Sequence, residues 1–237
     1  MNKNHKMYHF YMSILDVIFP KFCLGCGFLG QYLCQNCQKK LKYLNKDTCL
    51  YCEKNSYFGL THPKCLKKNR LDGSLSLFYY NEFFKKIVKN IKYRLALDVW
   101  EELKKIIPPD RTEKINLFKK LKKDFFIQPI PLHKERLKER GFNQAQLIAD
   151  YFNHYLNLPT IDALVRKKST VSQAQTKTKQ LRYGNLMGAF VVKTPVKNKN
   201  IILIDDVITS GATVKEATRA LKKAGAQQVF CLTLAKG

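Results

Sequence analysis

The feature that most constrains the fold is a run of thirteen residues near the C-terminus, 201–213, with the sequence IILIDDVITSGAT. Its four consecutive apolar residues predict a strand that is buried on both faces, as parallel strands usually are. Asp205 and Asp206 follow at the carboxyl end of this strand, where open α/β sheets bind their ligands. We expect the strand to end at Asp205 and the chain to turn there, so that both carboxylates can accept hydrogen bonds from one vicinal diol.

The loop after the two acids has the composition of a phosphate-binding site. It opens a helix that we expect over residues 213–224, and Gly225 supplies the left-handed residue that often ends a helix. A glycine in the loop lets the backbone curl, so that successive amides and hydroxyls face one anion at the positive end of the helix. The residues that we assign to a phosphate are Ile208, Thr209, Ser210, Gly211, Ala212 and Thr213.

The order of these thirteen residues resembles the signature of type I phosphoribosyltransferases, which bind 5-phosphoribosyl 1-pyrophosphate (PRPP). The resemblance implies that Asp205 and Asp206 hold the ribose hydroxyls, with Mg²⁺ bridging ribose and pyrophosphate. It implies that the loop holds the 5′-phosphate and that a second loop, Pro131–Arg136, cradles the pyrophosphate. It also implies a flap over the site, at roughly residues 167–187.

Strands alternate with helices over most of the chain, which predicts an α/β fold with a mainly parallel sheet. We expect strands at 125–132, 164–166, 189–192, 201–205 and 229–234, and helices at 82–107 (long or broken in two), 142–156 and 213–224. The fold class that follows is a type I phosphoribosyltransferase fold, residues 73–237, preceded by an N-terminal helix and a small zinc-binding module, residues 1–72.

The N-terminal module carries seven of the eight cysteines, between positions 23 and 65. Such clustering in CxxC pairs indicates metal binding, whereas a secreted disulfide protein would spread its cysteines along the chain. Two pairs complete one tetrahedral zinc site. Taken in sequence order, the pairs predict a double zinc ribbon with the ligands Cys23, Cys26, Cys34, Cys37, Cys49, Cys52, His62 and Cys65. His62 stands where the pattern of pairs calls for an eighth cysteine, so the sequence is compatible with one zinc ion or with two.

A second signature, PIPLHKERLKERGFNQ, spans residues 129–144. Arg136 and Arg140 are four residues apart, so in a helix they share a face and offer forked donors to a pyrophosphate or to DNA phosphates. The alternative is a solvated basic face that Glu135 and Glu139 balance. The residues that we assign to the pyrophosphate loop and its basic segment are Pro131, Leu132, Arg136, Arg140, Asn143 and Gln144.

Together, the cysteine pairs, this signature and the PRPP motif resemble the ComF family over nearly the whole chain. The flap of that family is recognisable in Gln173, Gln175 and Arg182. The resemblance implies a cytoplasmic competence factor that binds PRPP, or a related phosphoribosyl ligand, and single-stranded DNA during DNA uptake. Other competence or DNA-processing proteins are expected partners. The sequence identifies neither a catalytic residue nor an acceptor for phosphoribosyl transfer.

The charge of the chain agrees with a polyanionic ligand. The formal net charge is +25, from 43 basic and 18 acidic residues, and a field of this sign favours phosphorylated small molecules or nucleic acids. A surface that is simply cationic is the alternative. The sequence has no run of 18 apolar residues, so we expect no stable membrane span, and residues 10–19 fit an amphipathic helix.

Two other functions stay open at this point. One is a metabolic phosphoribosyltransferase of nucleotide synthesis or salvage, and the other is a regulator that senses PRPP without catalysis. The 6-oxopurine enzymes have an aspartate at the position of Thr209, so the resemblance disfavours that substrate class.

Overall fold

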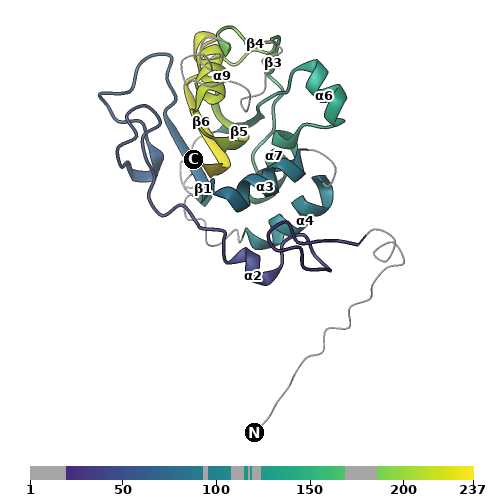
Figure 1. Cartoon of the computed structure of the whole chain (residues 1–237). Coiled ribbons are helices and arrows are strands. Elements are labelled where there is room, and N and C mark those ends of the chain that lie inside the picture. Colours follow the sequence, from purple (N-terminus) through teal and green to yellow (C-terminus); the bar gives the residue numbers. More distant parts are fainter. Residues whose placement is uncertain (1–19, 93–95, 108–114, 117, 119–123, 169–185) are drawn as a thin grey trace.

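The computed structural model describes residues 20–92, 96–107, 115, 116, 118, 124–168 and 186–237 (Figure 1). The helix expected at residues 10–19 and the flap residues Gln173, Gln175 and Arg182 lie outside these ranges.

A four-stranded parallel sheet occupies the centre of the described chain. Its strands lie in the order β1 (Gly73–Tyr79), β6 (Gln228–Lys236), β5 (Asn200–Ile208) and β2 (Phe125–Pro129), and every neighbouring pair is parallel. The prediction of a mainly parallel α/β sheet is therefore confirmed.

Strand β1 is not among the predicted elements. Its sequence, GSLSLFY, alternates serines with apolar residues, so it lacks the continuous apolar run of a strand buried on both faces. Nevertheless, six of its seven residues are buried. The hydroxyls of Ser76 and Thr233 on β6 form a 2.7 Å hydrogen bond, so burying Ser76 leaves its hydroxyl with a partner.

Helices cover both faces of the sheet (Figure 1). Helices α3 (Glu82–Ile91), α4 (Ala96–Ile106) and α7 (Gln144–Leu156) pack into one apolar core, and α9 (Ala212–Lys223) packs into the other. The helical pattern over residues 82–107 thus corresponds to two helices. The Asn81 side chain caps α3 by accepting a hydrogen bond from the amide of Phe84. The apolar spacing of α3 buries Phe83, Phe84, Ile87, Val88 and Ile91.

Strand β5 is longer than predicted. It continues past Asp205 to Ile208, and it pairs with β6 as far as Ile208 and Lys236. The expectation that the chain turns at Asp205 is therefore wrong, because the parallel neighbour β6 keeps the backbone extended. Successive side chains of a strand point to opposite faces, so Asp205 and Asp206 leave β5 on opposite sides of the sheet.

A second, two-stranded sheet lies beside the first. It pairs β3 (Leu164–Arg166) with β4 (Phe190–Val192) in the antiparallel sense. Both strands were predicted, and the segment that joins them contains the expected flap. The short helix α6 (Lys134–Arg140) follows the loop after β2.

The N-terminal module, residues 20–72, has little regular structure, as the sequence suggests. It contains helix α2 (Gln35–Gln38) and one 3₁₀ turn, η1 (Tyr57–Gly59). Backbone bridges join it to β1, from Tyr43 to Phe78 and from Leu60 to Gly73. Among the described residues, no helix is both long enough and apolar enough to span a membrane.

Candidate functional site

The two acids of the PRPP motif lie near the carboxyl end of β5. Asp206 is buried, and its Oδ1 accepts a 2.7 Å hydrogen bond from the amide of Val207. Asp205 Oδ1 accepts from the amide of Asp206 at 2.9 Å. Burial, together with the neighbouring charge of Asp206, raises the pKa of the Asp205 carboxyl, and the ammonium of Lys92 opposes this shift. The pair therefore concentrates negative charge in a poorly solvated place, which favours a cation or hydroxyl donors there.

Lys92 is the cation that the structure supplies. It caps the C-terminal end of α3, and its Nζ lies 2.5 Å from Asp206 Oδ2. Burial alone would lower the pKa of Lys92, but the carboxylates of Asp206 and Asp205 outweigh it, so the pKa is raised. No role in this site was predicted for Lys92, because no local sequence pattern indicates that α3 ends opposite β5.

On the β3 side, Arg166 brings a third arginine to the site. A backbone bridge between His133 and Arg166 sets β3 beside the loop that follows β2. Burial, followed by the positive charge of Arg136, lowers the pKa of the Arg166 guanidinium, and the carboxylate of Asp205 opposes this. Arg140 also contributes to the lowering. The charges of Arg136, Arg140 and Asp205 thus all act on the Arg166 guanidinium, as expected of a site for a multiply charged anion.

Arg166 was not predicted as a site residue. The available signal was an arginine at the end of an apolar strand, directly before the flap. Its guanidinium lies 5.6 Å from the centre of the Phe190 ring on β4, and its side chain is largely buried. A buried arginine at such a place carries a desolvation cost, which a bound anion would offset.

The predicted pyrophosphate loop, Pro131–Arg136, is shorter in the structure. Pro131 and Leu132 lie outside regular elements and are half-buried, but His133 already caps α6, which begins at Lys134. Arg136 is therefore a helical residue. It shares α6 with Arg140, as their spacing of four predicted.

Asn143 and Gln144, at the start of α7, contact the loop after β2 and the end of α6. The Asn143 side chain caps α7 by accepting from the amide of Ala145 at 3.1 Å, and its Nδ2 donates to the Ile130 carbonyl at 3.1 Å. Gln144 is buried and accepts a 3.1 Å hydrogen bond from Arg140 Nη1. Both residues thus hold the loop and Arg140 in place.

The phosphate-type loop lies between β5 and α9, with Gly211 at the N-cap of the helix. Gly211 has φ = 70°, a left-handed conformation that favours glycine. Thr209 and Ser210 are half-buried, and the amide of Ala212 donates to Ser210 Oγ at 3.4 Å. Lys215 Nζ donates to the carbonyl of Ser210 at 3.3 Å. The loop therefore places amides and hydroxyls at the start of a twelve-residue helix, where anions are stabilised.

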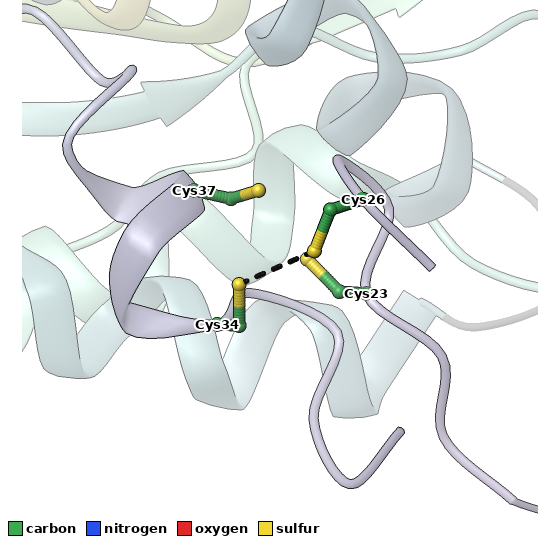
Figure 2. Close-up of side chains that lie close together, drawn as sticks. All are labelled: Cys23, Cys26, Cys34 and Cys37. Carbon is green, nitrogen blue, oxygen red and sulfur yellow. Dashed lines mark hydrogen bonds between the residues drawn. The ribbon is translucent and has the colours of Figure 1, made fainter. Parts of the chain in front are cut away.

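The structure brings the eight predicted metal ligands together as two tetrads, in the pairing taken from sequence order. The first is Cys23, Cys26, Cys34 and Cys37 (Figure 2), the second is Cys49, Cys52, His62 and Cys65, and within each the ligand atoms lie within 4.8 Å of one another. In the first tetrad, the Sγ atoms of Cys26 and Cys34 are 3.6 Å apart. Four soft donors at this spacing fit a tetrahedral zinc ion.

His62 has the environment of a zinc ligand. Its Nδ1 lies 3.2 Å from Cys52 Sγ, and its Nε2 lies 3.0 Å from the carbonyl of Asn55. When Nε2 donates its hydrogen to that carbonyl, the lone pair of Nδ1 is directed to a metal, which is the usual arrangement of zinc-bound histidines. The histidine in place of a cysteine therefore suits the second tetrad.

The thiol pKa values agree with metal binding. Burial alone would raise the pKa of Cys23, but backbone hydrogen bonds, the largest from Cys34, lower it to about 6. Burial and the neighbouring sulfurs raise the pKa of Cys37 to about 12. One thiolate in the tetrad therefore disfavours deprotonation of a neighbouring thiol. A divalent cation among the four sulfurs would relieve this repulsion.

Comparisons with known proteins agree with both parts of the architecture. Residues 137–237 match the Phosphoribosyl transferase domain family, and residues 14–66 match the Double zinc ribbon domain family. The chain is 31% identical to "Competence protein ComFC" of Bacillus subtilis, over 85% of this chain and 83% of that protein. It is 27% identical to "Competence protein F" of Haemophilus influenzae, over 86% of this chain and 90% of that protein. "DNA utilization protein YhgH" of Escherichia coli matches at 35% identity over 45% of this chain and 48% of its own length. The predicted phosphoribosyltransferase fold and zinc-ribbon module are confirmed.

We predict that Lys92→Met lowers the free energy of unfolding by about 3 kcal/mol, because it leaves the carboxylate of Asp206 buried without its counter-charge. The double variant Lys92→Met/Asp206→Asn should regain most of this loss. Lys85→Met is the matched control on the same helix, since Lys85 pairs with the exposed Glu82 and should change stability far less. Urea denaturation measures all three, and equal losses for Lys92→Met and Lys85→Met would contradict the assignment.

We predict two zinc ions per chain in untagged protein, one in each tetrad. His62→Ala should retain one ion after a challenge with a chelator, whereas His62→Cys should retain two, because thiolate and imidazole are both competent zinc ligands. Elemental analysis by mass spectrometry measures the ratio. A single ion in the unmodified protein would rule out the second site.

Proposed function

Because this chain belongs to the ComF family of competence proteins, we propose that it is a competence factor for natural transformation that binds PRPP with Mg²⁺. The observation that carries the proposal is a single grouping at the carboxyl end of the parallel sheet. Two carboxylates lie near the end of β5, a phosphate-type loop follows them at the N-terminus of α9, and the charges of Asp205, Arg136 and Arg140 all act on Arg166. PRPP has the complementary groups: a diol, a 5′-phosphate and a pyrophosphate.

The 5′-phosphate is assigned to residues 208–213. Gly211 gives the backbone its left-handed turn, and the amides that follow open α9. The hydroxyls of Thr209, Ser210 and Thr213 supply further donors. The loop itself offers no anionic side chain, which suits a doubly charged ligand.

The ribose is assigned to Asp205 and Asp206, and the pyrophosphate to the arginines. Carboxylates accept hydrogen bonds from the diol, whereas guanidinium groups bind phosphates through paired donors. Arg136, Arg140 and Arg166 would receive the pyrophosphate. Bound Mg²⁺ would neutralise part of the pyrophosphate charge, and Asp205 and Asp206 are oxygen ligands of the type that it accepts.

We further propose that the chain binds single-stranded DNA in the cytoplasm. The net charge of +25 favours a polyanion, and relatives are named for competence and for DNA utilization. Seven of the eight cysteines belong to the two tetrads, and cysteines clustered for metal binding are typical of intracellular proteins.

Isothermal titration calorimetry with PRPP and Mg²⁺ tests the ligand. We expect binding to the wild-type chain and at least about tenfold weaker binding to Asp205→Asn, because a hydrogen bond to a charged acceptor contributes about 1.5–3 kcal/mol. Asp162→Asn is the control, since Asp162 is exposed and pairs with Lys193. Equal affinities of wild type and Asp205→Asn would contradict the assignment.

Release of pyrophosphate with a panel of nucleobases would show a transferase.

The DNA proposal predicts a strong dependence on salt. The logarithm of the association constant for single-stranded oligonucleotides should fall linearly with the logarithm of the salt concentration, by about 0.7 for each phosphate contacted. Fluorescence anisotropy measures this slope. An absence of binding at low salt would remove DNA from the proposed function.

A further inference from the structure

We propose that Leu50 and Tyr51, the two residues between the cysteines of the third pair, are positioning residues for the phosphate loop. A zinc ion in the second tetrad and a phosphate at the loop then strengthen each other's binding. The inference rests on the proposed function, because the phosphate is taken to be that of the phosphoribosyl ligand.

Leu50 supports the loop directly. A Cβ atom placed on Gly211 would lie 2.9 Å from Leu50 Cδ1, so the leucine side chain is in close contact with this glycine. Leu50 is 6% exposed and belongs to the same apolar cluster as Ile208, Ala212 and Val214. A residue of the zinc module is therefore a core neighbour of both ends of the loop.

Tyr51 acts on the loop through a lysine. The Tyr51 hydroxyl accepts a 2.8 Å hydrogen bond from the amide of Leu71, which fixes the ring. Lys215 Nζ lies 5.3 Å from the centre of that ring, within the range of a cation–π interaction, and donates to the carbonyl of Ser210. The Tyr51 ring thus positions the Lys215 ammonium, which in turn binds the Ser210 carbonyl of the loop.

The same ring is connected to the metal site. The Arg70 guanidinium lies 4.5 Å from the centre of the Tyr51 ring, and its Nη1 donates to the carbonyl of Cys65 at 2.8 Å. Contacts therefore run without interruption from the ligand residue Cys65 through Arg70 and Tyr51 to Lys215.

A further link flanks the third cysteine pair. Lys236 Nζ donates to Thr48 Oγ1 at 2.6 Å, and Thr48 directly precedes the ligand Cys49. Lys236 ends β6 opposite Ile208, the first residue of the phosphate loop. The second metal site and the loop are thus both attached at the carboxyl ends of the central strands β5 and β6.

These contacts predict reciprocal coupling. Zinc fixes the backbone of a CxxC turn, because binding one ion holds the ligand side chains of the turn together. Leu50 and Tyr51 hold their places only while that turn is fixed, so loss of the ion should loosen the loop. If zinc raises the affinity of the loop for its ligand by some factor, linkage requires that the ligand raise the affinity of the second tetrad for zinc by the same factor.

The first tetrad provides an internal control. It lies beside α4 (Figure 1), where the amides of Tyr32 and Leu33 donate to the carboxylate of Glu102. Its first CxxC turn is Cys23-Leu24-Gly25-Cys26, so Leu24 occupies the position that Leu50 has in the second tetrad. Leu24 packs against the core on the α3 side.

Hydrogen–deuterium exchange of the amides of residues 208–213 tests the positioning without any ligand. We expect Leu50→Ala and Tyr51→Leu to speed this exchange about tenfold, because the loop opens more often when its support is lost. Leu24→Ala should leave the exchange unchanged. Affinity for PRPP with Mg²⁺ should fall about five- to tenfold in the first two variants and stay constant in the third.

Zinc release from the wild-type chain tests the coupling and does not depend on how well Leu50→Ala and Tyr51→Leu fold. Saturating ribose 5-phosphate, which carries the 5′-phosphate without a chelating pyrophosphate, should slow release from the second tetrad about five- to tenfold. Release from the first tetrad should not change. A chromogenic chelator follows the two phases, and Cys26→Ser and Cys52→Ser assign them.

The possible results separate the two proposals. Faster loop exchange in Leu50→Ala, but not in Leu24→Ala, in a chain that binds no PRPP would support the positioning and overturn the proposed ligand. PRPP binding with equal exchange and equal affinity in Leu50→Ala and Leu24→Ala would overturn the positioning. Zinc release that the sugar phosphate slows equally from both tetrads, or from neither, would overturn the coupling.

Discussion

Burial of β5 on both faces is the constraint on which the rest of the structure depends. Ile202 and Ile204 point into the core formed by α3, α4 and α7, whereas Ile201 and Leu203 point into the core beneath α9. Both cores therefore fix the same strand. The two acids lie in the last part of this strand, and the phosphate loop begins where the strand ends, so both are held in place by the same cores.

Placing two carboxylates at the end of such a strand requires positive charge from other elements. The structure supplies it from both sides, with Lys92 against Asp206 on the α3 side and Arg166 near Asp205 on the β3 side. These opposing charges compensate the cost of moving carboxylates out of water. Basic residues of this chain thus stabilise the two carboxylates at this site, in addition to the general attraction of the chain for polyanions.

Local patterns predicted much of this architecture. The apolar run of β5, the loop glycine and the CxxC spacings each act over a few residues, and the structure confirms the parallel sheet and both tetrads. Features that depend on distant partners were missed or wrong. Strand β1 needs Thr233 to bury its serine, the end of β5 is set by β6, and Lys92 and Arg166 belong to elements whose placement no short pattern specifies. The assignments of Gln173, Gln175 and Arg182 to a flap remain predictions.

The zinc module is more than an appended domain, because its second half packs into the core beneath the phosphate loop. A crystal structure of the chain with PRPP and Mg²⁺ tests the central claim most directly. The account predicts the 5′-phosphate on the amides of residues 208–213, the ribose hydroxyls at Asp205 and Asp206, and the pyrophosphate beside Arg136, Arg140 and Arg166. Density for PRPP at another surface, with the loop of residues 208–213 empty, would contradict it.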